Sequence, residues 1–222
     1  MIKPPGIIDN AIELPGRCYA IRMMPHEVDI ADIHDKWDQA YADAMKLIVD
    51  GNVDEGKEIL EELYRRKYNR AGHTLSYGYG AGWFGEPDPK KYLSLVYALV
   101  LKGYSAAFSD YGFCYDCGIG VKKSMRWALY WYRKAADYDD EEAQNILGLC
   151  YEEGIGVLKD YEKAYYWFSL AVKNGAGACA EHNLARCFRL GRGISEDKEM
   201  ANKYEALAIK HGFHKKDKGI VI

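Results

Sequence analysis

The sequence lacks the features of a membrane or secreted protein. Its 222 residues contain no run of about 18 apolar residues, the length that a membrane-spanning helix needs. The first ten residues hold two prolines and no apolar core segment, so they do not resemble a signal peptide. Six cysteines are too few for a disulfide scaffold of this length. These absences predict a cytoplasmic protein with reduced thiols and no membrane partner.

The chain also lacks an excess of basic charge. Its 33 Asp and Glu outnumber its 30 Lys and Arg, which gives a formal net charge of -3. Binding to nucleic acid needs clustered basic side chains that neutralise phosphates. Only Lys215, Lys216 and Lys218 form a local basic group, which we interpret as a solvated chain end. We therefore expect no nucleic-acid partner.

What the sequence does contain is 19 tyrosines and a pattern that recurs every 36 or 37 residues. The pattern is clearest over residues 143–175, and it recurs one period earlier over 107–139 and one period later over 180–212. A divergent copy begins at Ala71, and a still weaker one covers residues 37–69. Because matching positions are scattered along the whole period, a compositional bias does not explain them. A period of this length is typical of stacked helical repeats.

Each repeat reads as two helices joined by a turn. Ala143, Leu147 and Tyr151 are four residues apart, which places them on one stripe of a first helix. Gly154 follows and predicts the end of that helix, because glycine adopts the left-handed backbone conformation at little cost. Asp160 then suits the N-cap of a second helix.

The fold class that follows is an all-α solenoid of antiparallel helix pairs. Gly148 beside a leucine leaves room for the partner helix, and stacked pairs bury the apolar faces that one pair alone leaves exposed. We expect about five helix pairs over residues 37–212. Residues 1–36 do not repeat and are expected to cap the first pair or to lie along the groove, and residues 213–222 form a C-terminal tail.

The order of the residues that recur in each copy resembles the Sel1-like repeat, a relative of the tetratricopeptide repeat. The order is Ala, Leu-Gly, Tyr, Gly-x-Gly-Val, Asp, Lys-Ala, Trp-aromatic, Ala, and residues 143–175 match it almost completely. Residues 107–139 carry Ser124 at the position of the loop aspartate. The resemblance implies a solenoid that acts as a protein-binding scaffold, with no reaction and no cofactor.

The tetratricopeptide relatives line their concave face with the first helix of each repeat, and this analogy implies a set of partner-binding residues. The positions beside the predicted core stripe are His73, Tyr77, Ser109, Phe113, Asp116, Asn145, Leu149, Glu152, His182, Arg186 and Arg189. The face would pass from aromatic through acidic to basic side chains. We expect Tyr77, Phe113 and Leu149 to be exposed anchors; the alternative is that each packs against a neighbouring helix.

Two motifs suggest chemistry but have a simpler structural explanation. Cys114 and Cys117 form a C-x-x-C pair, which alone would suggest a redox or zinc site. However, Cys114, Cys150 and Cys187 share one repeat position, so we interpret them as structural and predict no metal. Residues 80–85 fit G-x-G-x-x-G, but they follow a helical stripe and not a strand, so we interpret them as a turn between helices.

The sequence leaves more than one class of function open. The leading hypothesis is a cytoplasmic scaffold that binds one protein through its concave face. Bacterial solenoids of this type include immunity proteins that inhibit a toxin, and the compact size suits such an inhibitor; a regulatory adaptor and a host-directed effector belong to the same class. The competing class is an enzyme with a groove site built from His73 or His182 and a carboxylate, but no nucleophile motif supports it and we predict no enzyme. A homo-oligomeric structural protein is a third class, and the sequence does not specify the oligomeric state.

Overall fold

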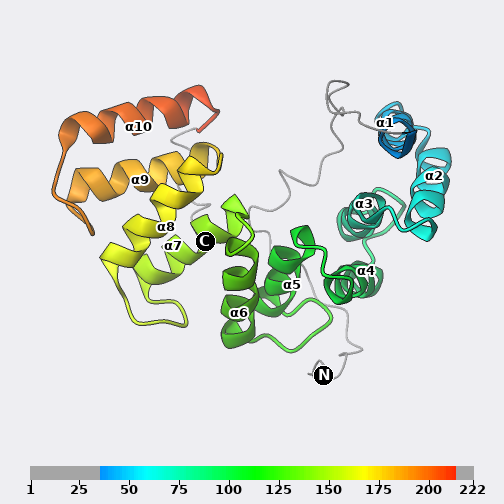
Figure 1. The fold of residues 1–222 in the computed structure, drawn as a ribbon, viewed down its shortest axis with the longest axis horizontal. Coiled ribbons are helices and arrows are strands. Elements are labelled where there is room, and N and C mark those ends of the chain that lie inside the picture. Colours follow the sequence, from blue (N-terminus) through cyan, green and yellow to red (C-terminus); the bar gives the residue numbers. More distant parts are fainter. Residues whose placement is uncertain (1–35, 214–222) are drawn as a thin grey trace. The chain divides into compact units, whose positions relative to one another are not determined.

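The computed structural model describes residues 36–213. The segments before and after this range, on which the predicted N-terminal cap and the basic tail fall, lie outside the described residues. Within the range the chain forms ten α-helices and no strand (Figure 1). The helices are α1 (Lys36–Val49), α2 (Val53–Arg65), α3 (Asn69–Ala81), α4 (Pro89–Leu101), α5 (Ala106–Cys117), α6 (Met125–Ala136), α7 (Glu141–Glu153), α8 (Tyr161–Lys173), α9 (Ala178–Leu190) and α10 (Lys198–Lys210).

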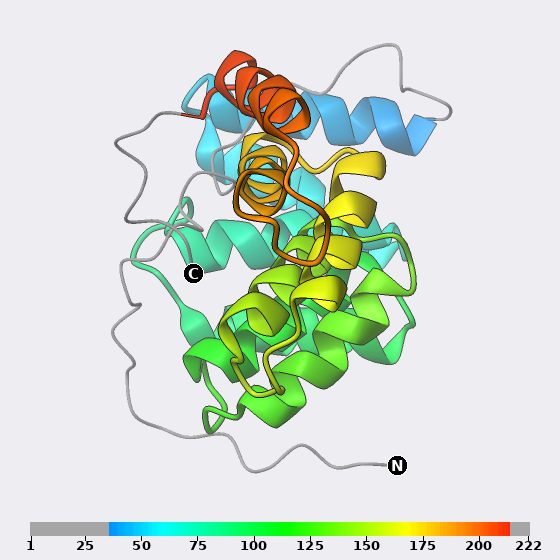
Figure 2. The same cartoon turned by 90° about the vertical axis from the view of Figure 1, so that its left-hand side faces the viewer.

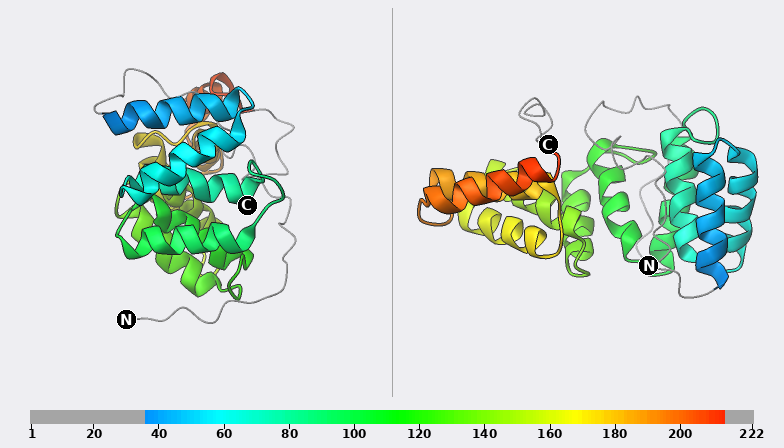
Figure 3. Two further views of the ribbon diagram at one scale, coloured as in Figure 1. Left: turned by 90° about the vertical axis from the view of Figure 1, so that its right-hand side faces the viewer. Right: turned by 90° about the horizontal axis from the view of Figure 1, so that it is seen from above.

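The helices belong to two compact units, one with α1 to α5 and one with α6 to α10. In the first unit α1 packs on α2 and α3 on α4, and these pairs are joined by contacts of α2 with α3 and of α4 with α5 (Figure 3). In the second unit α7 packs on α8 and α9 on α10, while α6 contacts α7 and α8 contacts α9 (Figure 2). This serial packing confirms the predicted all-α solenoid of helix pairs. None of the ten helices is long and apolar enough to cross a membrane.

The turns between the helices follow from single residues, as the sequence predicts. Gly154 ends α7 in the left-handed conformation with φ 75°, and its backbone N–H donates to the carbonyl of Cys150. Gly118 and Gly191 end α5 and α9 in the same way. Asp160 begins α8, where its side chain accepts a hydrogen bond of 3.0 Å from the backbone N–H of Lys163.

Close packing of paired helices depends on small residues at the contact. A Cβ atom added at Gly148 on α7 would lie 2.5 Å from the ring of Phe168 on α8, and that ring is fully buried. Between two successive pairs, a Cβ atom added at Gly72 on α3 would lie 2.4 Å from the ring of Tyr64 on α2. The room that Gly148 is predicted to leave for the partner helix is therefore confirmed.

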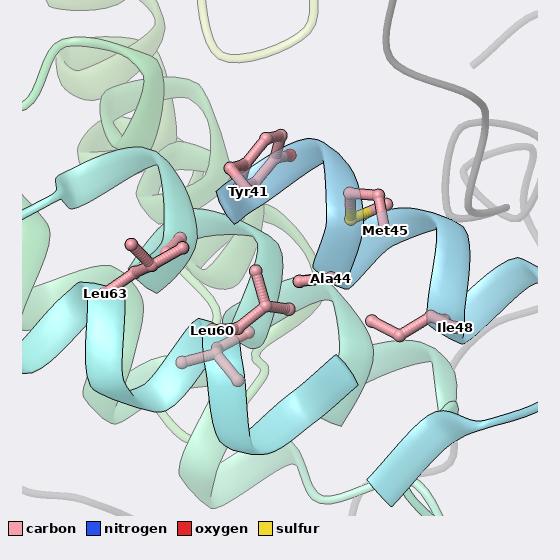
Figure 4. Packing of buried hydrophobic residues seen from close by; sticks show 8 residues of the cluster. Tyr41, Ala44, Met45, Ile48, Leu60 and Leu63 are labelled. Atoms are coloured by element: carbon pink, nitrogen blue, oxygen red, sulfur yellow. The ribbon is translucent and has the colours of Figure 1, made fainter. Parts of the chain in front are cut away.

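Each unit has its own apolar core between its helix pairs. In the first unit the core lies between α1, α2 and α3, and Figure 4 labels six of its side chains: Tyr41, Ala44, Met45, Ile48, Leu60 and Leu63. In the second unit a core of seven buried residues lies between α7, α8, α9 and α10: Leu149, Ala164, Phe168, Leu184, Cys187, Phe188 and Ala201. These cores include α3, α7 and α9, which carry most of the predicted partner-binding residues.

Candidate partner-binding surface

All predicted partner-binding residues lie on four first helices: α3, α5, α7 and α9. Most of them are half-buried, Arg189 is exposed, and two are buried, namely Leu149 and Glu152. Since α3 and α5 belong to one unit and α7 and α9 to the other, each unit presents its own set.

In the first unit, four side chains from α3 and α5 and the turn before α5 form one polar and aromatic group, which we call the His73 cluster: His73, Tyr77, Tyr104 and Asp110. His73 Nε2 and Asp110 Oδ2 share a hydrogen bond of 2.6 Å, and the Tyr77 hydroxyl donates to Asp110 Oδ1 at 3.0 Å. The rings of Tyr77 and Tyr104 lie edge-on to His73, with centroids at 4.8 and 5.6 Å. The Asp110 carboxylate therefore holds two predicted contact residues in fixed orientations.

Asp110 and Tyr104 are members of this cluster that the sequence prediction missed. A signal for Asp110 was present, because it follows His73 by 37 residues, one repeat period. Residues one period apart lie on neighbouring first helices, so Asp110 was placed to meet His73. Ser109, Phe113 and Asp116 share α5 with Asp110 and are half-buried.

In the second unit, Glu152 on α7 is the centre of a buried ionic group, the Glu152 cluster, with Arg186 and Arg192. The Glu152 side chain is fully buried, and the side chains of Arg186 and Arg192 are 21% and 33% exposed. Arg186 binds the carboxylate through two nitrogens, with Nε at 3.2 Å from Oε1, and Arg192 Nη1 lies 2.8 Å from the same oxygen. Two charged fork-shaped donors satisfy the carboxylate, which lowers the cost of burying it.

This arrangement differs from the expected acidic stretch of the groove. Glu152 presents no surface to a partner, because the arginine expected one repeat later along the groove covers it. Residues one period apart pair with each other across neighbouring helices. As a result the charges of Glu152 and Arg186 neutralise each other within the protein.

Leu149 also differs from its expected role as an exposed anchor. Its side chain is 9% exposed and belongs to the core of the second unit. The stripe that packs into the core is therefore wider on α7 than the sequence pattern indicated. Tyr77 and Phe113, by contrast, are half-buried and keep part of their rings accessible.

The remaining predicted residues of the second unit are held by hydrogen bonds between helices. Asn183 donates to the side-chain carbonyl of Asn145 at 2.9 Å. His182 Nδ1 lies 3.0 Å from Glu205 on α10, and the His182 ring stacks on Phe213 with centroids 4.1 Å apart. Arg189 reaches the same Glu205 carboxylate at 3.5 Å.

The cysteines behave as buried structural residues. Cys114, Cys150 and Cys187 are all buried at the equivalent place on α5, α7 and α9. Burial, together with the nearby Glu152 carboxylate, raises the pKa of Cys187 to about 12, so its thiol stays protonated at neutral pH. Within residues 36–213 no group of three or more His, Cys, Asp or Glu side chains is arranged to hold a metal ion.

The sequence from α5 onward also matches a known family model. The Sel1 repeat model matches residues 109–139, 141–175 and 180–213. The chain contains three Sel1 repeats. Their bounds agree with the repeats predicted from the sequence, so the resemblance to the Sel1 family is confirmed.

Solved Sel1-repeat structures share the fold. A Sel1 repeat protein from Oxalobacter formigenes superimposes with a TM-score of 0.72 at 23% identity, over 81% of this chain and 73% of that one. The antigen c5321 of uropathogenic Escherichia coli, described as an SLR fold, gives 0.64 at 28% identity and covers 71% of this chain. The match spans only 33% of the length of c5321.

A third similar structure is the immunity protein Pa5087 from Pseudomonas aeruginosa. It is 20% identical over 80% of this chain and 83% of that one, with a TM-score of 0.47. This likeness is too low to support an argument about function. A comparison with curated protein sequences gives no match.

Proposed function

We propose that this Sel1-repeat chain binds one protein partner through the side chains of its first helices. The Sel1-repeat fold suggests a scaffold for protein–protein interaction, and the fold itself implies no reaction. The surfaces in question are those of α3 and α5 in the first unit and of α7 and α9 in the second.

The observation that carries this proposal is the hydrogen bonding between successive first helices. His73 and Tyr77 are tied to Asp110, and Asn145 is tied to Asn183, yet most of these side chains stay half-buried and not fully covered. Side chains that are already ordered lose little conformational entropy when a partner binds. A surface of ordered side chains therefore suits specific binding better than a flexible, solvated polar surface does.

Capture of the partner and a matched set of variants test the proposal. The tagged full chain is used to isolate a stoichiometric partner from a lysate of the source organism, and the affinity of the purified pair is measured by calorimetry. Truncating the half-buried rings in Tyr77→Ala and Phe113→Ala is expected to weaken binding by about tenfold or more each, as anchor residues do.

The control for this experiment is a pair of exposed side chains away from the first helices. Tyr166 on α8 is 57% exposed and Leu158 before α8 is 90% exposed, so their replacement by Ala changes apolar surface without touching the proposed site. Equal losses for the control and the first-helix variants would contradict the proposed surface.

A finer form of the proposal is an immunity protein that inhibits a toxin. An inhibitor must hold a single partner tightly, and a preordered surface favours tight binding. If the captured partner stops growth when expressed alone, co-expression of this chain is expected to restore growth and Tyr77→Ala to reduce the rescue. A partner without toxicity would favour the adaptor or effector alternative.

An enzyme is the second candidate, and it has one observation in its favour. His73 and His182 each contact a carboxylate, Asp110 and Glu205, which is the pairing that orients a histidine base in many active sites. The same contacts also position a binding residue, so turnover is the decisive readout. Loss of a measured turnover in the folded His73→Ala, His182→Ala double variant would favour the enzyme over the scaffold.

A further inference from the structure

Arg70, the second residue of α3, is a cation without a counter-charge. Its guanidinium carbon lies 4.6 Å from the ring centroid of Tyr41 on α1, and within residues 36–213 it forms no ion pair with a carboxylate. The arginines on α9, which is the first helix of its repeat, differ from Arg70. Arg186 is paired with Glu152 and Arg189 with Glu205. Arg70 is exposed and forms hydrogen bonds with the hydroxyl groups of Tyr41 and Tyr68, but a guanidinium has five N–H donors, more than these two hydroxyl groups accept.

The aromatic side chains around Arg70 are neutral. Although partial burial opposes its charge, the adjacent oxygens of Tyr41 and Tyr68 raise the pKa of Arg70, so it stays protonated. Burial raises the pKa of both Tyr68 and Tyr104, and these phenols are therefore uncharged at neutral pH. The tyrosines surround the cation without neutralising it.

The two carboxylates of this region are engaged elsewhere. Asp38 accepts a hydrogen bond from the Tyr68 hydroxyl. Asp110 is held by His73 and Tyr77. Within the described part of the first unit neither carboxylate forms an ion pair with Arg70, which lies next to the His73 cluster.

We propose that Arg70 receives a carboxylate side chain, aspartate or glutamate, from the protein partner. This inference rests on the proposed function, and it names the chemistry of one contact on the first-helix surface. The planar guanidinium matches a carboxylate with two parallel hydrogen bonds. The ring of Tyr41 supports the guanidinium from one side, which reduces the conformational freedom lost on binding.

A carboxylate fits this site better than a phosphate. Sites for dianionic phosphates combine several arginines or lysines. Here the nearby Arg66 is already paired with Glu62, and the carboxylates of Asp38 and Asp110 lie near the same tyrosines as Arg70. A second negative charge on the ligand would be repelled by these two groups. A monoanion matches the single unpaired charge.

Selection from a random-peptide display library on the immobilised full chain tests the inference. We expect the peptides that bind the wild-type chain to be enriched in Asp or Glu at one position, and this enrichment to be lost with Arg70→Gln. The matched control is Arg65→Gln on α2, which removes the same charge from an exposed arginine paired with Glu62. Circular dichroism shows whether each variant is folded.

A double-mutant cycle on the best selected peptide then measures the contact itself. Changing its acidic residue to the amide should weaken binding to the wild-type chain roughly 10- to 100-fold, the range for a charged hydrogen-bonded pair. The same change should have little effect on binding to Arg70→Gln. Arg70→Lys should recover only part of the affinity, because an ammonium lacks the two-pronged geometry.

The outcomes separate this inference from the proposed function. Selected peptides without a preferred acid, or without coupling to Arg70, would overturn the carboxylate contact and leave partner binding in place. No selected peptide for any variant would overturn the contact and count against the proposed function as well.

Discussion

At the residue scale, this fold depends on a few positions where only a small or a buried neutral side chain fits. Gly148 leaves 2.5 Å between a hypothetical Cβ and the ring of Phe168, and this ring has no exposed surface into which it could shift. Cys187 is buried beside a charged group and keeps its proton. Both positions lead to measurable consequences for stability.

Gly148→Ala is expected to destabilise the protein by about 1–3 kcal/mol, because overpacking a rigid core outweighs the better helix propensity of alanine. Urea unfolding followed by circular dichroism measures the difference. Gly177→Ala is the control, since no atom lies within 4 Å of a Cβ added there. A loss of stability in the control that equals the loss in Gly148→Ala would disprove the packing explanation.

Stability should fall above pH 9 in part because of Cys187. The pKa of this thiol rises from 9.0 to about 12 on folding, so the unfolded state loses the proton first. The stabilisation is fully present below pH 9 and is lost as the pH rises towards 12, by at most about 1.4 kcal/mol per pH unit.

Urea unfolding under reducing conditions between pH 8 and pH 11 measures this contribution. Cys187→Ala is expected to lower the slope of stability against pH above 9, whereas Cys179→Ala at an exposed position should leave it unchanged. Burial also raises the pKa of Tyr68, Tyr104 and Tyr111, but these tyrosines contribute equally to all three proteins. Identical slopes in all three would contradict the assignment to Cys187.

At the scale of the element, an aspartate at the N-cap marks the start of three second helices. Asp88, Asp160 and Asp197 accept a hydrogen bond from the backbone N–H three residues later, at the starts of α4, α8 and α10. Ser124 takes the same place before α6 but forms no such bond. Its backbone angles, φ −157° and ψ 101°, are close to those of Asp160, φ −153° and ψ 101°.

Restoring the aspartate at this position is expected to stabilise the protein. Ser124→Asp should raise the free energy of unfolding by up to about 1 kcal/mol, and Asp160→Ala should lower it by about the same amount. Thermal and urea unfolding measure both changes, with Asp160→Asn as a control that retains an acceptor oxygen. If Ser124→Asp has no effect, the aspartate does not reach the N–H groups of α6.

At the scale of the whole molecule, each unit is held together by polar contacts between helices that are one repeat period apart. Glu152 connects α7 to Arg186 on α9 and to Arg192 in the turn that follows. Removing one partner from a buried ionic group leaves the others without compensation. We therefore expect the Glu152 cluster to contribute strongly to the second unit.

Glu152→Gln is expected to destabilise the protein by about 2–4 kcal/mol, somewhat less than for a fully buried pair because both arginines keep some contact with water. The neighbouring Glu153 is an ideal control, because it is exposed and lies at 4.0 Å from Lys159. Glu153→Gln should cost less than about 0.5 kcal/mol. Equal effects of the two substitutions in urea unfolding would refute the role of the buried cluster.

The repeats and the helix ends could be read from the sequence because they depend on local chemistry. Glycine at the end of α7 and aspartate at the start of α8 act on the backbone within a few residues, so their effect needs no knowledge of distant contacts. Because the pattern recurs every 36 or 37 residues, it predicts a turn between two helices at the same place in each copy.

The candidate surface was less predictable, because its residues depend on neighbours a full repeat away. The sequence placed Glu152 and Arg186 in a groove as separate charges, whereas the structure pairs them and buries the first. Asp110 was overlooked although its spacing from His73 equals one period.

The amino-acid sequence alone thus determined the helical class, the length of the repeat, the positions of the turns and the resemblance to the Sel1 repeat. These features arise from backbone preferences and from apolar periodicity along a single helix. Only the tertiary structure decided which polar side chains are free and which are paired, including the unpaired Arg70 and the buried Glu152. The reason is physical: the exposure and pairing of a charge depend on the helix that packs beside it, and that helix lies a full repeat away in the chain.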